Sequence, residues 1–370
     1  MNWKIPLFKI YWNKDDINAV SSIIKKGSCW ALGPEIKEFE EKIAQYIGTQ
    51  YAVTFNSGTS ALYAMMIAYG IKQGDEVIIP SFTFIATANS VLMVNAKPVF
   101  ADIERNTYGL DIESVKEKIT SKTKAIMPIH YGGCPALYTK ELKELAEDHN
   151  LLFFEDAAQS FGAKIGKQKV GTFGDASMFS FCQDKVLALG EGGVIVTDNK
   201  DIYEKLKLIR SHGRADSKDY FSSNEIFDYI TLGYNFRMPT ILAALGISQL
   251  NKIDKIITKR KDISNLYNLY LSKIVKLFSS SNVYCVYQKY PIEIDNRDDL
   301  KKHLEQKKIM TRSYFDLPVH HTKFYKEKFE YGKLPITDEI SLKILNLPIY
   351  PNLKSNEIEY IIKSIQELCN

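Results

Sequence analysis

Short apolar segments alternate with longer amphipathic ones between residues 51 and 198, and this alternation constrains the fold more than any other feature of the chain. Parallel strands need a crossover connection, usually a helix, to return the chain to the same edge of a sheet. The pattern therefore predicts an α/β fold with a mostly parallel central sheet and helices on both faces. Seven strands are predicted, at residues 51–56, 75–80, 97–102, 124–131, 151–156, 176–181 and 192–198.

The pattern changes at about residue 250, where a long polar helical stretch begins. We predict a large domain over residues 1–250, including an N-terminal arm, and a smaller C-terminal α+β domain over residues 251–370. The segment 214–230 is the least periodic part and is predicted to be a loop. Other predicted elements are helices at 35–47, 60–70, 252–275 and 355–368 and strand residues within 283–294.

Charge and hydropathy exclude several classes of protein. The 370 residues include 48 Lys and Arg and 44 Asp and Glu, a net charge of +4 that is spread along the chain. This distribution argues against binding to nucleic acid or a membrane surface through bulk charge. No stretch reaches the roughly 18 apolar residues of a membrane span, and the N-terminal segment lacks the regions of a secretory signal. We therefore expect a cytoplasmic protein.

Cysteine and histidine spacing indicates neither disulfides nor a structural metal. The five cysteines are far apart and form no CxxC pair, so we expect reduced thiols. Only one histidine pair is adjacent, and no HxxxH spacing occurs, so no metal ligands are predicted. The cysteines are Cys29, Cys134, Cys182, Cys285 and Cys369.

The segment NSGTSAL at 56–62 follows a predicted strand and begins a predicted helix. Gly58 allows a ligand to approach the backbone closely, and Thr59 and Ser60 place amides and hydroxyls at the positive end of the helix dipole. This arrangement suits a phosphate. Ser and Thr also serve as ordinary helix N-caps, so the segment alone leaves both interpretations open.

Two acidic residues end the predicted strand in FFEDAAQSFGA at 153–163. A carboxylate at the carboxyl end of a parallel strand lies at the edge where open α/β sheets bind ligands. Strand alternation directs Glu155 and Asp156 to opposite faces, and we take Asp156 as the functional candidate. A helix N-cap is the alternative role for Asp156.

A single lysine, Lys185, lies in the glycine-bordered segment SMFSFCQDKVLALGEGGVIVTDN at 177–199. An apolar setting disfavours the charged amine, and the neutral amine condenses with carbonyl compounds. Most lysines are solvated surface groups, so this segment too is ambiguous alone. The glycines form neither a Walker A loop nor a dinucleotide fingerprint, because no GK[ST] follows and GEGG precedes a strand.

Together, the three segments provide a phosphate site, an acid and a lysine in that order, which are the anchors of a pyridoxal phosphate (PLP) site. The chain resembles the DegT/DnrJ/EryC1/StrS family of sugar aminotransferases, a branch of the fold type I PLP enzymes. The resemblance runs nearly from end to end. It includes NSGTSAL, IIPSFTFIATANSV, EDAAQSFGA, SFCQDKVLALGEGGVIVTDN, LGYNFRMPTILAALGISQL and LPVHHTKFY.

The resemblance implies a role for each matching residue around the cofactor ring. Lys185 would link covalently to PLP and later move the substrate proton. Asp156 would pair with the pyridinium nitrogen and keep it protonated, so that the ring withdraws electrons. Gln159 matches the residue near the phenolic oxygen. Phe84 matches the aromatic residue stacked on the ring, although a core phenylalanine is the alternative.

The resemblance also implies how the phosphate is held. Gly58, Thr59 and Ser180 match the phosphate-binding positions of the family. Asn235 matches a residue that reaches the phosphate from the neighbouring subunit, which implies at least a homodimer with sites shared across the interface.

The implied reaction transfers an amino group from L-glutamate to a nucleotide-linked keto-sugar, in surface-glycan or amino-sugar biosynthesis. His320 matches a histidine near the sugar pocket, and Arg237 and Arg214 are candidates for the diphosphate because guanidinium groups suit phosphate oxygens. The CQD turn before the lysine differs from the His-Pro or Tyr-Pro of many relatives and leaves the sugar open. The GEGG turn and the RSHG segment favour C4 over C3 of a keto-6-deoxyhexose.

Three other functions are weighed against this interpretation. A branch of the family that dehydrates at C3 carries histidine in place of the lysine, whereas this chain has Lys185. A nicotinamide-dependent dehydrogenase would need a GxGxxG turn, which is missing. A non-catalytic binding or regulatory module would be expected to lack the lysine or the acid, or to carry an appended DNA-binding segment.

Overall fold

A computed structural model describes residues 2–215, 228–277 and 283–369 of the chain. Most of the segment 214–230, predicted to be a loop, lies outside the described residues.

The central sheet has seven strands in the order β1-β9-β8-β5-β4-β2-β3. β9 runs antiparallel to β1 and β8, and the other neighbouring pairs are parallel. The prediction of seven strands in a mostly parallel sheet is therefore confirmed. The strands are β1 (Tyr51–Phe55), β2 (Glu76–Pro80), β3 (Lys97–Ala101), β4 (Thr123–Ile126), β5 (Leu152–Asp156), β8 (Ala176–Ser180) and β9 (Gly193–Thr197).

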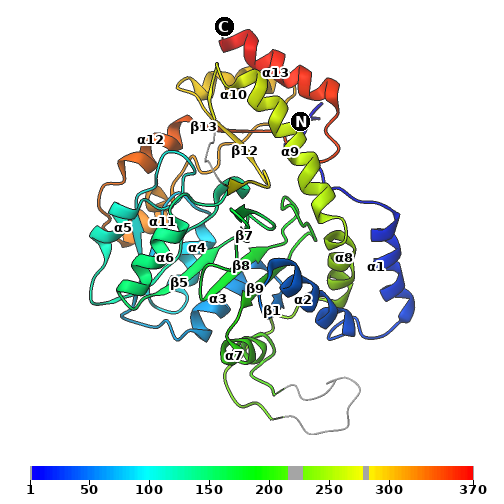
Figure 1. The fold of residues 1–370 in the computed structure, drawn as a ribbon, viewed down its shortest axis with the longest axis vertical. Helices are drawn as coiled ribbons and strands as arrows, with labels where there is room; N and C mark the ends of the chain where they lie inside the picture. Colours follow the sequence, from blue (N-terminus) through cyan, green and yellow to red (C-terminus); the bar gives the residue numbers. More distant parts are fainter. Residues whose placement is uncertain (1, 216–227, 278–282, 370) are drawn as a thin grey trace.

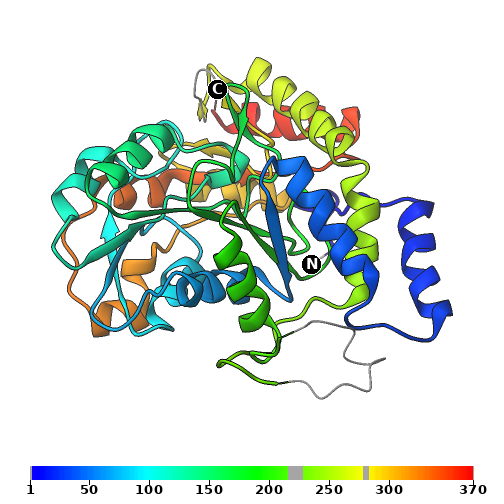
Figure 2. The same ribbon diagram turned by 60° about the horizontal axis from the view of Figure 1, so that its bottom comes forward.

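Helices cover both faces of this sheet (Figure 1), and Figure 2 shows the sheet between the two helical layers. One face packs against α3, α4 and α7. The other packs against α2 and α8 around β1, β8 and β9 and against α5 and α6 around β2, β4 and β5. The bounds are α2 (Pro34–Ile47), α3 (Gly58–Ala68), α4 (Ile85–Leu92), α5 (Ile112–Lys118), α6 (Thr139–Asp148), α7 (Lys200–Arg210) and α8 (Thr240–Leu250).

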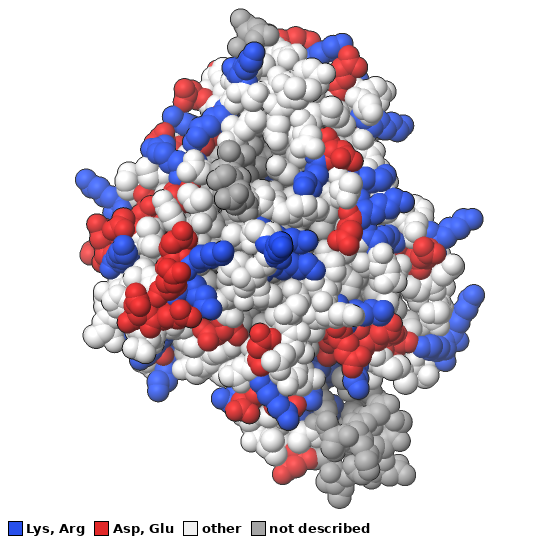
Figure 3. All heavy atoms as spheres, viewed as in Figure 1, with Lys and Arg blue, Asp and Glu red and all other residues white. Residues whose placement is uncertain are grey.

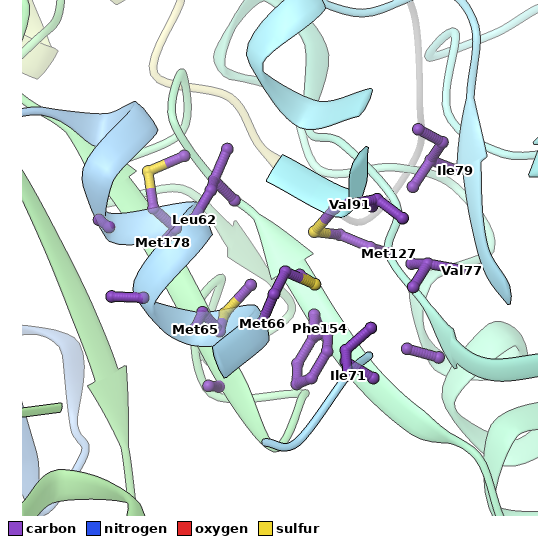
Figure 4. Packing of buried hydrophobic residues seen from close by; sticks show 14 of the residues in the cluster. Leu62, Met65, Met66, Ile71, Val77, Ile79, Val91, Met127, Phe154 and Met178 are labelled. Atoms are coloured by element: carbon purple, nitrogen blue, oxygen red, sulfur yellow. The ribbon is translucent and has the colours of Figure 1, made fainter. Parts of the chain in front are cut away.

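The core beneath α3 explains why that helix is apolar on nearly all sides. Leu62, Met65 and Met66 project from α3 toward Phe154 and Met178 of the sheet (Figure 4). All five side chains are almost completely buried. Burying each such side chain stabilises the fold by about 1.5–3 kcal/mol, so this packing fixes α3, and with it the loop that precedes α3.

A second sheet, in the order β10-β12-β13, packs with α9, α10 and α13 into a separate core. Ile5 from the N-terminal segment is buried in this core, and both chain ends lie near it (Figure 1). Later residues return to the main sheet, because Val319 and Tyr325 belong to the core beneath α3. The elements are α9 (Ile253–Leu271), β10 (Lys276–Leu277), β12 (Tyr290–Glu293), α10 (Arg297–Gln306), η2 (Val319–His321), α11 (Lys323–Lys328), α12 (Pro335–Lys343), β13 (Ile344–Leu347) and α13 (Ser355–Cys369).

Smaller elements complete the described chain. An N-terminal helix packs against α8, and a small sheet in the order β11-β6-β7 links the two parts of the chain. These elements are α1 (Lys14–Lys26), η1 (Tyr131–Gly133), β6 (Lys164–Ile165), β7 (Gln168–Lys169) and β11 (Val283–Tyr284).

The expectation of reduced cysteines is wrong for one pair. Cys134 and Cys285 are joined by a disulfide, although 151 residues separate them in the sequence. The backbone brings them together, because Val286 N donates to Gly133 O at 2.8 Å. Cysteine spacing carries no information about this contact, which depends on how the segment before β12 packs beside η1. Cys29 and Cys182 are free thiols.

Basic and acidic side chains are interspersed over the face drawn in Figure 3. Within the described residues, no helix is long and apolar enough to cross a membrane.

Candidate active site

The candidate site begins at the carboxyl end of β5, where Glu155 and Asp156 point to opposite faces of the sheet. Glu155 accepts hydrogen bonds from Ser177 Oγ at 2.9 Å and Phe173 N at 2.9 Å. Asp156 instead meets α4, because its Oδ2 accepts from Thr87 Oγ1 at 2.7 Å. The alternation predicted for the two carboxylates is the alternation observed.

Asp156 is a buried carboxylate with few partners. Its Oδ1 accepts a hydrogen bond from Ala158 N at 3.2 Å. No lysine, arginine or histidine in the described part of the chain forms an ion pair with it. Burial raises the pKa of Asp156, although the hydrogen bonds from Thr87 and Ala158 and the charge of Lys185 oppose this rise. A protonated ring nitrogen facing Asp156 would supply the missing positive partner.

Glu155 is satisfied within the protein. His130 Nδ1 accepts from Ala136 N at 3.0 Å, so Nε2 carries the proton and donates to Glu155 Oε2 at 3.1 Å. Burial raises the pKa of Glu155, but the hydrogen bond from His130, together with those from Gly171 and Ser177, holds it below its usual value. Glu155 is therefore a structural anion, whereas Asp156 is available to a ligand.

The loop before α3 lies against the end of β8. Ser57 is the N-cap of α3 and accepts from Ser60 N at 3.1 Å. A Cβ added at Gly58 would lie 3.2 Å from Ser180 Cβ, and one added at Gly193 would lie 2.6 Å from Ser57 O. The N-cap and anion interpretations are therefore compatible, because Ser57 caps the helix while Gly58, Thr59 and Ser180 lie together beside its positive end.

Phe84 is not a core residue. It is the N-cap residue of α4 and is 61% exposed, although it is large and apolar. Thr87 N donates to Phe84 O at 3.1 Å, and Thr87 also binds Asp156. Phe84 thus lies one helical turn from the residue that binds the buried carboxylate, and an exposed aromatic ring is suited to stacking on a planar ligand.

Lys185 lies in the turn after β8, and its side chain is 15% exposed. Its Nζ is 3.4 Å from Asp184 Oδ1, and its charge acts on Asp156. Gln288 Nε2 donates to Asp184 O at 2.9 Å, which ties this turn to the segment before β12. The lysine is thus held between the main sheet and the second core.

Gln159 and His320 lie at the same edge of the sheet. Gln159 Oε1 accepts from Gly132 N at 2.8 Å. His320 Nδ1 is 2.6 Å from the hydroxyl of Ser81, the residue after β2. Burial and the neighbouring His321 lower the pKa of His320, and Asp338 opposes this shift. Gln159 thus contacts the η1 segment, and His320 contacts the end of β2, three residues before Phe84.

Asn235, Arg237 and Arg214 form a separate group around Ser211, at the end of α7. Arg214 Nη2 and Arg237 Nη1 each lie 3.4 Å from Ser211 Oγ, and Asn235 pairs with Ser211 through the backbone. Asn235 is exposed. The group borders the loop before α3, since Asn56 N donates to Phe236 O at 2.8 Å.

Sequence reasoning missed several residues of this region. Thr87 lies within the quoted segment SFTFIATANSV and Asp184 directly precedes the lysine, so both could have been found by position. No local sequence pattern indicates a role for Gln288, Lys289 or Asp338. Asp338 Oδ1 lies 3.2 Å from His320 Nε2 and 2.8 Å from His321 Nε2, a cluster that histidine spacing did not indicate.

Residues 11–366 match the family described as the DegT/DnrJ/EryC1/StrS aminotransferase family. The chain belongs to this family. The family resemblance drawn from the motifs is therefore confirmed, and the chain is an aminotransferase by family.

Similar proteins agree with this assignment along nearly the whole aminotransferase chain. This chain is 37% identical over 346 residues to GDP-perosamine synthase of Escherichia coli O157:H7, and the match covers 92% of each chain. The structure of S. venezuelae DesV in complex with a ketimine intermediate is 29% identical, with a TM-score of 0.93 and coverage of 100% of this chain and 99% of that chain. The structure of NtdA from Bacillus subtilis with bound cofactor PMP is 26% identical, with a TM-score of 0.87 and coverage of 96% of this chain and 81% of that chain.

Proposed function

We propose that this aminotransferase uses PLP to move an amino group from L-glutamate to a nucleotide-linked keto-sugar, at C4 of a keto-6-deoxyhexose, in surface-glycan or amino-sugar biosynthesis. The observation that carries the proposal is Asp156, a buried carboxylate without an ion-pair partner among the described residues, at the sheet edge that also holds Phe84 and Lys185. The similarity to GDP-perosamine synthase supports a nucleotide-sugar substrate. The PMP bound in NtdA supports the cofactor.

The residues present fit the cofactor. Asp156 offers a buried negative charge for a ring N–H, and Phe84 offers an exposed aromatic face. The space beside Gly58 would be reduced by any Cβ, which suits close approach of a phosphate to the backbone. When bound, PLP supplies an electron-withdrawing ring and a carbonyl carbon that takes up the amino group.

Each of these side chains then has a definite task. Asp156 keeps the proton on the ring nitrogen, because a buried anion stabilises a facing cation strongly. Phe84 holds the ring by stacking, and the amides at the start of α3 hold the phosphate with Thr59 and Ser180. Lys185 anchors the cofactor and later carries a proton to and from the substrate carbon as a general base and acid.

We propose that the working enzyme is a homodimer whose two sites are shared across the interface. The exposure of Asn235 supports this arrangement, since a side chain meant for the partner's phosphate site is left uncovered in one chain. Arg214 and Arg237, grouped with Asn235 around Ser211, are then the proposed contacts to the sugar diphosphate, and His320 is the proposed contact to the sugar.

The test is the absorbance spectrum of PLP-reconstituted protein before and after addition of L-glutamate, beside a Lys185→Ala variant. We expect the wild-type chromophore to convert with glutamate and the variant to fail in that conversion, since each half-reaction leaves a different chromophore. A wild-type spectrum with no protein-bound chromophore at saturating PLP contradicts the proposal. A protein-bound chromophore that does not change with L-glutamate indicates that the amino donor is another compound or that the reaction is a dehydration.

Product analysis separates the finer parts of the proposal. Nuclear magnetic resonance of the product from a nucleotide-linked 4-keto-6-deoxyhexose should place the new amine at C4. Amination of a 3-keto sugar instead, with no reaction of the 4-keto sugar, rules out the C4 assignment.

A further inference from the structure

A second lysine, Lys289, lies in a small cavity between the main sheet and the second core. The residue is only 7% exposed. It precedes Tyr290 at the start of β12 and lines the cavity together with Asp184, Gln288, Tyr314 and Asn346. A buried lysine on a cavity wall needs a partner, because an unpaired buried charge is costly.

Backbone and side-chain contacts fix Lys289 beside the candidate active site. Gln288 Nε2 donates to Asp184 Oδ2 at 3.2 Å, and Asp184 is the residue that Lys185 contacts. Lys289 N donates to Gly132 O at 3.0 Å, and Gly132 N donates to Gln159. Lys289 is therefore tied to the turn that carries Lys185 and to the loop that holds Gln159.

The amine of Lys289 has no anion of its own among the residues that the structure describes. In the described part of the chain, its Nζ forms neither a hydrogen bond nor an ion pair, and it lies 4.0 Å from the ring centroid of Tyr314 and 5.3 Å from that of Phe315. Asp184 acts on Lys289, but the same carboxylate lies 3.4 Å from Lys185 Nζ. The Asp184 carboxylate is thus shared between Lys185 and Lys289.

A third cation adds to this excess of positive charge. The guanidinium of the exposed Arg312 lies 4.8 Å from the Tyr314 ring centroid and also acts on Lys289. Arg312 forms no ion pair within the described residues. Burial, together with the charges of Lys185 and Arg312, lowers the pKa of Lys289 to about 7. A bound anion would reverse this effect and favour the charged amine.

We propose that Lys289 and Arg312 form an anion-binding subsite beside Lys185 that receives a carboxylate of the substrate. The inference rests on the proposed function, which supplies two sources of that carboxylate: the amino-acid donor and a nucleotide-linked sugar that is itself a uronic acid. Lys289 provides the buried charge, and the exposed Arg312, which lies against Tyr314 of the cavity wall, provides a planar pair of donors. The aromatic rings around Lys289 keep water away and strengthen the interaction.

The test compares the wild-type holoenzyme with Lys289→Met, which keeps the length of the side chain and removes the charge. The probe is glutarate, a dicarboxylate without an amino group, titrated by calorimetry, so that binding is measured apart from turnover. Lys261→Met is the matched control. Like Lys289, Lys261 has its amine near a tyrosine ring, 3.7 Å from the ring centroid of Tyr284, but Lys261 does not line the cavity.

We expect Lys289→Met to weaken glutarate binding and to raise the KM for L-glutamate by about 10- to 100-fold, the size of one charge-assisted hydrogen bond. The kcat should be retained, since the lost interaction serves binding. Lys289→Arg should restore most of the affinity, and Lys261→Met should bind like the wild type.

The remaining outcomes either identify the source of the carboxylate or overturn a proposal. In one outcome, Lys289→Met leaves the binding of glutarate and L-glutamate unchanged and loses affinity for a nucleotide-linked uronic acid but not for its neutral analogue. This result assigns the carboxylate to the sugar. Equal affinities for all anions in wild type and Lys289→Met overturn the subsite, as does a fall in kcat alone that Lys289→Arg does not restore. If the wild type binds glutarate through Lys289 yet never transaminates, the proposed function fails and the subsite stands.

Discussion

Glu155 and Asp156 are neighbours on one strand, are both buried, and have opposite surroundings. Glu155 accepts hydrogen bonds from His130 and from four further donors, and its pKa is held below the usual value. Among the described residues, the Asp156 carboxylate accepts hydrogen bonds only from Thr87 and Ala158, and burial raises its pKa. Strand alternation alone separates the two faces. A buried carboxylate is therefore a candidate for function when the fold leaves part of its hydrogen-bonding capacity unused.

The largest expected effect is the loss of stability in Glu155→Gln. Each carboxylate oxygen of Glu155 accepts from at least two donors, and the substitution replaces one of them by an amide group that donates. Each buried donor left unsatisfied costs about 1–3 kcal/mol, so the free energy of unfolding should fall by about 3–5 kcal/mol. Urea denaturation followed by circular dichroism measures it. Equal stability of Glu155→Gln and wild type would remove the structural half of the comparison.

Asp156→Asn should show the converse behaviour. Transamination should fall by about 10²- to 10³-fold, because the ring nitrogen loses the anion that keeps it protonated. Folding should be preserved, since a neutral amide suits this poorly solvated position. Single-turnover kinetics with L-glutamate and a denaturation curve measure the two quantities on one sample. Full activity in Asp156→Asn contradicts the assigned role.

The two carboxylates should also give opposite pH dependences of stability. The folded-state pKa of Glu155 is lowered, so its stabilising contribution is present above its ordinary pKa of about 4.3 and is lost as pH falls through the folded value. The pKa of Asp156 is raised, so ionisation of Asp156 lowers stability as pH rises above its ordinary value of about 3.9.

Denaturation of both variants between acidic and neutral pH checks this contrast. The stability gap between wild type and Glu155→Gln should close on acidification. Asp156→Asn should gain stability over wild type toward neutral pH. Parallel curves for the two variants would show that surroundings do not distinguish the carboxylates.

The smallest expected effect is in Thr87→Val, which removes one donor from Asp156. One hydrogen bond contributes about 1 kcal/mol, so the rate with L-glutamate should fall by about fivefold. Thr87→Ser keeps the hydroxyl and should retain the rate. A loss as large as that in Asp156→Asn would mean that Thr87 contacts the substrate or the cofactor itself.

Features that depend on local periodicity could be predicted from the amino-acid sequence alone. The seven strands, the crossover helices and the opposite directions of Glu155 and Asp156 follow from backbone geometry that repeats every few residues. The order of Gly58, Asp156 and Lys185 likewise predicted a PLP-type site, and the family match confirmed the family resemblance. The division at residue 250 and the roles of the individual site residues stay predictions.

Contacts between segments that are distant in the chain became visible only in the folded structure. The Cys134–Cys285 disulfide, the Asp338 carboxylate beside His320 and the contact of Gln288 with Asp184 each join residues that no local pattern connects. The folded structure also shows that Phe84 is exposed rather than buried in a core. The physical reason is that these contacts depend on packing of whole helices and sheets, whose side-chain neighbours come from anywhere in the sequence.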